Sequence, residues 1–152
     1  MTKTERARLP AVEIRAVCDC ADIDIDAIKS YAMAAMAETG HDAVELSVLL
    51  ADDADVRKLN RQYRGVDRTT NVLAFPQRES SQGLPGTKLL GDVVISVEKA
   101  RRDSARERLP LSEELKKLVV HGILHLSGYD HRTGPQVQRM RQLEQSIIER
   151  TK

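Results

Sequence analysis

Three of the four histidines of the chain fall in one short window, as His121, His125 and His131. On a helix, His121 and His125 lie one turn apart, so both imidazoles can reach one point. Gly128 is well placed to end that helix with a positive φ, and the turn after it can bring His131 to the same point. Three neutral nitrogen ligands with an open fourth position are typical of a catalytic zinc site. The spacing therefore predicts one metal ion per chain, with zinc as the default.

The neighbours of these histidines leave alternatives open. Asp130 either accepts a hydrogen bond from a ligand imidazole and so orients it, or simply caps the turn. His41 is the remaining histidine and the candidate fourth ligand of a purely structural metal. Histidines satisfied in the core or on the surface are the plainer alternative, which three residues at ligand spacing argue against.

The histidine spacing also matches the metzincin proteases, whose motif is H-E-x-x-H-x-x-G-x-x-H. Those enzymes carry a glutamate directly after the first histidine, and this glutamate deprotonates the metal-bound water. The present chain has Gly122 at that position, which offers no carboxylate. A peptidase with the usual mechanism is therefore not expected, and an unusual metallopeptidase remains the alternative.

A second group of residues suggests phosphate binding. Arg57, Arg61 and Arg64 recur at spacings of four and three, which gathers them on one face of a predicted helix. Guanidinium groups match phosphate oxygens, so these three are candidate substrate-binding residues; a solvated helix face is the alternative. The apolar positions of the same helix are Val56, Leu59 and Tyr63. We expect these apolar side chains to face the core.

The elements that position these residues alternate between strands and helices. Strands are expected at about 12–16, 44–50, 71–75 and 90–96. Helices are expected at about 24–40, 52–64, 97–106, 112–127 and from 135 to the C-terminus. This mixture predicts an α+β or α/β fold rather than a helical bundle or a β-sandwich.

Composition limits the classes of protein that the chain can belong to. Its 152 residues, 41% of them apolar and 31% charged, fit one compact domain and exclude a disordered or collagen-like chain. The net charge of +1 excludes a globally basic nucleic-acid coat, so attraction for phosphate must be local. Cys18 and Cys20 are spaced unlike a Cys-x-x-Cys motif and are expected to be ordinary reduced thiols, with a metal or redox role as the alternative. With no membrane span and no export signal visible, the expected location is cytoplasmic.

With both groups in view, the chain resembles the YbeY family of bacterial endoribonucleases that mature ribosomal RNA. The resemblance rests on residues 121–131, HGILHLSGYDH, whose family form is H-G-x-L-H-L-x-G-Y-D-H. Further family motifs follow in order: LN at 59–60, YRG at 63–65, TNVLAFP at 70–76 and LGDVVI at 90–95. Two positions depart from the family pattern, since Thr69 stands where a proline is common and Ala74 where a serine is common.

The resemblance implies an α+β fold in which a mixed four-stranded sheet is flanked by about five helices. It implies a single YbeY-like metallo-endoribonuclease domain over residues 1–152, with one zinc ion held by His121, His125 and His131. It also implies cleavage of single-stranded RNA in 16S rRNA 3′-end maturation and ribosome quality control. Its partners would be rRNA and the ribosome, with no membrane or DNA. The functionally important arginine of the family matches Arg64.

The expected chemistry is hydrolysis of a phosphodiester bond. The metal would polarise a phosphoryl oxygen or supply a bound hydroxide, and Arg64 would neutralise charge that develops on the phosphoryl oxygens. Asp92 and Asp130 are possible general bases, although structural roles suit them better, and attack by the 2′-OH of the RNA stays open. A ribosome-associated factor with a structural metal is a further alternative to an enzyme.

Overall fold

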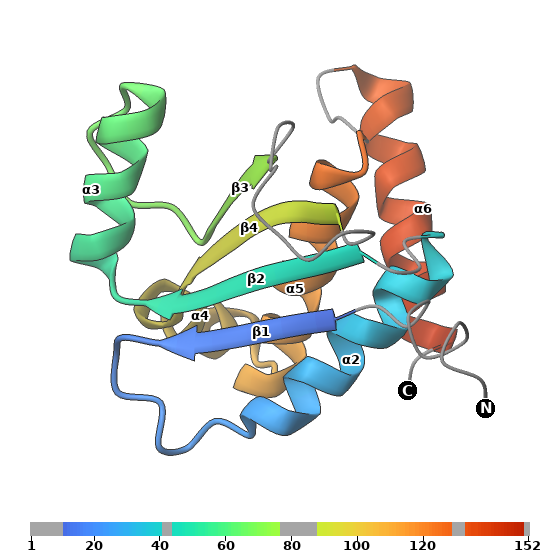
Figure 1. Cartoon of the computed structure of the whole chain (residues 1–152). Coiled ribbons are helices and arrows are strands. Elements are labelled where there is room, and N and C mark those ends of the chain that lie inside the picture. Colours follow the sequence, from blue (N-terminus) through green and yellow to red (C-terminus); the bar gives the residue numbers. More distant parts are fainter. Residues whose placement is uncertain (1–10, 41–43, 77–87, 129–132, 151–152) are drawn as a thin grey trace.

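A four-stranded sheet forms the centre of the molecule, with strand order β1-β2-β4-β3 (Figure 1). The structure is a computed structural model that describes residues 11–40, 44–76, 88–128 and 133–150. The strands are β1 (Ala11–Ala16), β2 (Val44–Ala51), β3 (Val72–Pro76) and β4 (Lys88–Ser96). The pairs β1–β2 and β2–β4 are parallel, whereas β3 runs antiparallel to β4 at the edge of the sheet. The mixed four-stranded sheet is therefore confirmed.

The part of the chain that the structure describes contains five helices, as expected. They are α2 (Ile25–Glu38), α3 (Asp53–Arg64), α4 (Val97–Glu107), α5 (Leu111–Leu126) and α6 (Gly134–Arg150). Local sequence explains where they begin and end. Asp24, Asp52 and Ser96 each accept a hydrogen bond from a backbone N–H in the first turn of α2, α3 and α4. Gly65 ends α3 with a φ of 71°, so Arg64 occupies the last helical position.

The two faces of the sheet are covered very unequally. On one face, α2, α4, α5 and α6 bury the main core, to which Val93 and Ile95 of β4 contribute. On the other face, α3 is the one helix among the described residues that packs over a small cluster, which includes Val56, Leu73 and Val94. Figure 1 shows α3 standing apart from the other helices. This asymmetry leaves the last turn of α3 beyond its own small core.

One sequence expectation about α3 is wrong. Val56 is fully buried and Leu59 packs against the small cluster, but the side chain of Tyr63 is 63% exposed. Helical periodicity places Tyr63 on the same side of the helix as Val56, yet Tyr63 lines an open pocket between α3 and the sheet instead of packing into the core. The Tyr63 ring instead lies at 5.4 Å from the ring of Phe75, centroid to centroid.

Two further expectations concern cysteines and membranes. Cys18 and Cys20 are free, with their Sγ atoms 2.8 Å apart. Burial and the neighbouring thiol raise the pKa of Cys18 to about 12, which keeps it protonated and unreactive at neutral pH. These are the ordinary thiols that the sequence predicts. Within the described ranges, none of the helices combines the length and apolar character that a bilayer span requires.

Candidate functional site

His121 and His125 lie on successive turns of α5 and line one pocket of about 230 Å³. The same pocket is lined by Arg64 from the end of α3 and by Thr70, Asn71, Val72, Ala74 and Gly122. The two histidines and Arg64 come from helices far apart in the sequence, and β3 lies between those helices in the chain. The fold therefore brings His121 and His125 of the predicted metal site together with Arg64, one of the three predicted phosphate-binding arginines.

A carboxylate from α6 fixes the orientation of His121. The His121 Nδ1 atom lies 2.7 Å from Oε1 of Glu144, whose side chain is 19% exposed. When Nδ1–H donates to this carboxylate, the neutral imidazole carries its lone pair on Nε2. A carboxylate behind a histidine in this way is the usual arrangement for a metal-ligating imidazole. His121 is therefore set up as a nitrogen ligand.

The sequence analysis missed Glu144, although the chain contains a hint of it. Met140 and Ile147 are the buried residues of α6, and Glu144 is four positions after the first and three before the second. A carboxylate on the buried stripe of an amphipathic helix needs a polar partner. Asp130 was the predicted candidate for this orienting role, and Asp130 lies outside the described residues.

The third predicted ligand, His131, lies outside the described residues, as does His41, the alternative fourth ligand. Among the residues that are described, no three His, Cys, Asp or Glu side chains gather as metal ligands would. The described part of the chain thus provides two of the three predicted nitrogen donors, and the three-histidine site remains a prediction.

Gly122 has a packing role that bears on the protease alternative. A Cβ atom on residue 122 would lie 2.8 Å from both methyl carbons of Val93, which is buried in β4. Glycine is therefore required for α5 to approach the sheet this closely. A glutamate here would collide with the sheet, so the backbone geometry as well as the residue type argues against a protease base at this position.

The three arginines of α3 have different surroundings. Arg57 forms a bidentate ion pair with Asp67, with Nε–Oδ1 at 2.8 Å and Nη2–Oδ2 at 3.3 Å. This hydrogen bond lowers the pKa of Asp67 and raises that of Arg57. Arg61 is exposed and does not line the histidine pocket. Of the three, Arg64 alone lines that pocket.

Asp92, one of the possible general bases, is on the wrong side of the sheet. Side chains alternate along a strand, and the neighbouring Val93 faces α5. Asp92 lies instead in a pocket between the sheet and α3, which it shares with Tyr63 and Phe75. The structure does not bring Asp92 to the histidines, and it is not a general base for chemistry there.

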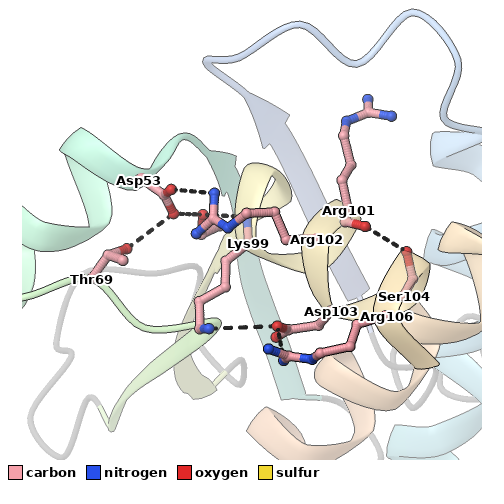
Figure 2. A network of polar contacts seen from close by, with 9 residues as sticks. Asp53, Thr69, Lys99, Arg101, Arg102, Asp103, Ser104 and Arg106 are labelled. Atoms are coloured by element: carbon pink, nitrogen blue, oxygen red, sulfur yellow. Dashed lines mark hydrogen bonds and ion pairs between the residues drawn. The ribbon is translucent and has the colours of Figure 1, made fainter.

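Asp53, whose side chain is partly buried, holds the start of α3 in place (Figure 2). Its carboxylate accepts hydrogen bonds from Ser96 Oγ at 2.6 Å, Arg102 Nη1 at 2.7 Å and Thr69 Oγ1 at 3.2 Å. Burial acts to raise the pKa of Asp53, but the hydrogen bonds from Arg102, Ser96 and Thr69 outweigh it and hold the pKa below its usual range. Asp53 therefore ties α3 to α4 and to the loop that enters β3.

Two further hydrogen bonds hold the loop that enters β3. Asn60, which is buried, donates from Nδ2 to the carbonyl oxygen of Arg68 at 2.8 Å. The backbone N–H of Ser96 donates to the carbonyl oxygen of Asn71 at 3.0 Å. Because Thr70 and Asn71 line the histidine pocket, these contacts make one wall of that pocket rigid.

The basic side chains of α4 form a salt-bridged surface with acidic residues. Asp103 pairs with Lys99 and with Arg106 along the helix, as Figure 2 shows. Arg101 pairs with Asp22 at 2.6 Å, and Arg102 takes part in the Asp53 cluster. These charges have structural partners and do not contribute to the histidine pocket.

We expect Asp53→Asn to destabilise the protein and to reduce the loss of its unfolding free energy as the pH falls. Because the pKa of Asp53 is lower in the folded than in the unfolded chain, the stabilisation it gives is present above about pH 4 and is lost as the pH falls through the folded pKa. At pH 7 the variant should lose about 1–3 kcal/mol of unfolding free energy, the usual worth of hydrogen bonds to a charged group. Urea unfolding at pH 7 and at pH 3 measures both effects.

The matched control for this experiment is Asp22→Asn, because Asp22 accepts from Arg101 on the open surface. An exposed ion pair contributes little, so this variant should unfold at nearly the wild-type urea concentration at pH 7. Equal losses in the two variants would show that the Asp53 cluster does not anchor α3.

Comparison with known proteins identifies the family. The family model described as "Endoribonuclease YbeY" matches residues 17–152. A protein of that description from Rhodopseudomonas palustris strain BisA53 is 42% identical over 146 residues, which cover 91% of this chain and 85% of the relative. Another from Aquifex aeolicus is 44% identical over 124 residues, which cover 81% of each chain.

The fold is shared with a solved structure. The solution structure of TM1509 from Thermotoga maritima superposes with a TM-score of 0.58 at 23% identity, over 90% of this chain and 88% of that one. That similarity concerns the fold, while the sequence matches carry the family assignment. A chain that matches the family model over nearly its whole length, and these relatives at about 40% identity, belongs to the Endoribonuclease YbeY family, whose members are hydrolases acting on RNA.

Proposed function

We propose that residues 1–152 act as one metal-dependent endoribonuclease domain that hydrolyses phosphodiester bonds of single-stranded RNA. One observation carries the proposal: His121, His125 and Arg64 line a single pocket, with His121 oriented by Glu144. The proposed metal is one zinc ion held by His121, His125 and His131. The donors fit this ion, since zinc favours neutral imidazole nitrogens and a carboxylate behind them.

The residues of the histidine pocket have different proposed roles in the reaction. A bound zinc ion would supply Lewis acidity and would lower the pKa of a water to about 7. Arg64 holds two phosphoryl oxygens through its planar fork and neutralises the charge that grows on them in the transition state. Thr70 and Asn71 line the histidine pocket with side chains that can form hydrogen bonds, and these can position the ribose and phosphate. Arg57 and Arg61 are proposed to attract phosphates farther along the strand.

The cellular target that we propose is the 3′ end of 16S rRNA, with a related role in ribosome quality control. Support comes from the family to which the chain belongs and from the motifs that this chain shares with it. Such a target would place the protein in the cytoplasm, in contact with rRNA and the ribosome, and not with DNA or membranes. Incubation with a precursor 30S particle, followed by mapping of the rRNA 3′ end, tests this assignment.

The peptidase alternative has a separate test. Casein and a mixed peptide library should remain intact under conditions in which end-labelled single-stranded RNA is cut, because residue 122 has no room for the protease glutamate. Peptide cleavage that zinc chelation abolishes would contradict the proposal.

We expect Glu144→Gln to weaken zinc binding by about 10- to 100-fold, which is the usual effect of losing an orienting carboxylate. A glutamine can still accept from His121 Nδ1–H, but it does not raise the basicity of Nε2 as a carboxylate does. Competition with a chromophoric zinc chelator measures the affinity without reference to catalysis.

The matched control is Glu149→Gln on the same helix. Glu149 is exposed and contacts Gln145, at 3.1 Å, rather than a histidine. Its zinc affinity should equal that of the wild type. Equal affinity of Glu144→Gln and wild type would show that Glu144 does not orient a metal ligand.

A further inference from the structure

A second, larger pocket of about 550 Å³ lies on the face of the sheet that α3 covers. Leu59 and Tyr63 of α3, Phe75 of β3 and Val94 of β4 form its apolar walls, and Arg15 and Asp92 bring charged groups to it. A mostly apolar pocket with a few polar groups is the usual form of a small-ligand site. Neither the metal nor the phosphate role proposed above uses it.

The exposed ring of Tyr63 indicates that this pocket binds a ligand with a flat ring. Its side chain is 63% exposed, and its ring is tilted by 55° against that of Phe75. The other large exposed apolar residues of the described chain, Val17 and Leu109, do not line this pocket. A solvent-exposed aromatic ring backed by a second ring is the kind of platform on which nucleobases stack.

The two pockets lie on opposite faces of the sheet, on either side of strand β3. Tyr63 lines the larger pocket and Arg64, the next residue, lines the histidine pocket. Across from them, Phe75 and Ala74 are likewise consecutive residues that line different pockets. Consecutive side chains of a strand point to opposite faces, and β3 is the last strand of the sheet order. An RNA strand that passes around this edge can therefore contact Arg64 with a phosphate on one side and place an adjoining base against Tyr63 on the other.

The charges in the larger pocket favour a base over a phosphate. The Asp92 carboxylate repels phosphate but accepts hydrogen bonds from the amino groups of bases. The Arg15 guanidinium donates to base carbonyl oxygens and ring nitrogens, or stacks on a base. Both groups thus suit the edge of a base whose faces lie between apolar side chains.

We propose that this pocket binds a nucleobase of single-stranded RNA, adjacent to the phosphodiester that is cleaved, by stacking on the exposed ring of Tyr63, which Phe75 supports. This inference rests on the proposed ribonuclease function and adds to it a reason for single-strand specificity. A base paired in a duplex presents no open face, whereas an unpaired base can leave its neighbours and enter the pocket. Tyr63 is thus a substrate-binding residue.

Kinetics with single-stranded RNA test the role of Tyr63. Tyr63→Ala should raise KM roughly 5- to 150-fold, the range that corresponds to loss of one base–aromatic stack, with kcat little changed. Tyr63→Phe keeps the ring and should behave as wild type. Leu109→Ala removes an exposed apolar side chain outside the pocket and should also leave KM unchanged. An unchanged KM in Tyr63→Ala would overturn the proposal.

Abasic substrates identify the base that is bound. RNAs that lack a single base, at each position around the cleavage site in turn, should include one that wild type binds more weakly. Tyr63→Ala should not distinguish that RNA from the intact one, because the stack is already lost. Additive losses from the two changes would place the base elsewhere and overturn the proposal.

A binding measurement separates this inference from the ribonuclease proposal. RNA with 2-aminopurine at the bound position should lose fluorescence when mixed with the His125→Ala protein. This variant is chosen so that the RNA stays uncut. The double variant, which carries both His125→Ala and Tyr63→Ala, should leave the fluorescence unchanged. Quenching that depends on Tyr63 supports the base site even if wild type cuts no RNA. If Tyr63→Ala quenches and cleaves normally but no longer binds ribosomal subunits, the pocket docks a protein and the proposal is wrong.

Discussion

Arg64→Lys is expected to lower kcat/KM for single-stranded RNA by roughly 10²- to 10³-fold, comparable to the loss of one donor that stabilises charge in a transition state. The substitution keeps the positive charge but loses the planar fork that holds two phosphoryl oxygens at once. Arg64 lies at the end of α3 and lines the histidine pocket. Asp53 holds the start of this helix, and Asn60 holds the loop that follows the helix. The loss should therefore appear in kcat as well as in KM.

Arg101→Lys is the matched control for this prediction. Arg101 also uses its fork, on Asp22, but at a surface away from the histidines. This variant should cleave RNA at the wild-type rate. Full activity in Arg64→Lys would show that Arg64 is not the residue that stabilises the reacting phosphate.

Removal of the metal is the second change with a large expected effect. Protein treated with a zinc chelator and then desalted should lose RNA cleavage to below detection, and one equivalent of zinc should restore it. The apoprotein should stay folded, because the main core between the sheet and four helices contains no metal ligand among its buried residues. Circular dichroism before and after chelation measures this.

The same experiment discriminates against a structural metal. A structural zinc contributes to folding directly, so its loss would unfold the chain and abolish binding of RNA as well as cleavage. Chelated protein that is unfolded would favour that alternative. Chelated protein that still cleaves RNA would contradict a metal-dependent mechanism.

Much of the fold could be predicted because its boundaries are encoded locally. Asp24, Asp52 and Gly65 act as caps in the structure, and alternating or helical periodicity marks the strands and helices between such residues. The order of the strands could not be obtained in this way. The parallel pairing of β2 with β4 joins segments separated by α3 and β3, and periodicity alone does not indicate which strands are neighbours.

The site was predictable where spacing alone decides the geometry. His121 and His125 share one pocket because an interval of four places two side chains on one face of a helix. Glu144 and the environment of Asp92 depend on how distant elements pack, so the sequence missed the first and left the second open as a base. Tyr63 shows the same limit, since periodicity gives the side of a helix but not whether that side packs tightly against the sheet or lines a pocket.

The central claim is that the histidines hold a metal that RNA cleavage requires. Wild type and His125→Ala, purified in parallel, should be compared for metal content and for cleavage of an end-labelled single-stranded RNA. The account predicts about one zinc per chain and cleavage for wild type, with both lost in the variant, and the chemical nature of the product ends then distinguishes attack by water from attack by the 2′-OH. Equal cleavage by the two proteins, or a zinc-loaded wild type that leaves the RNA intact, would contradict it.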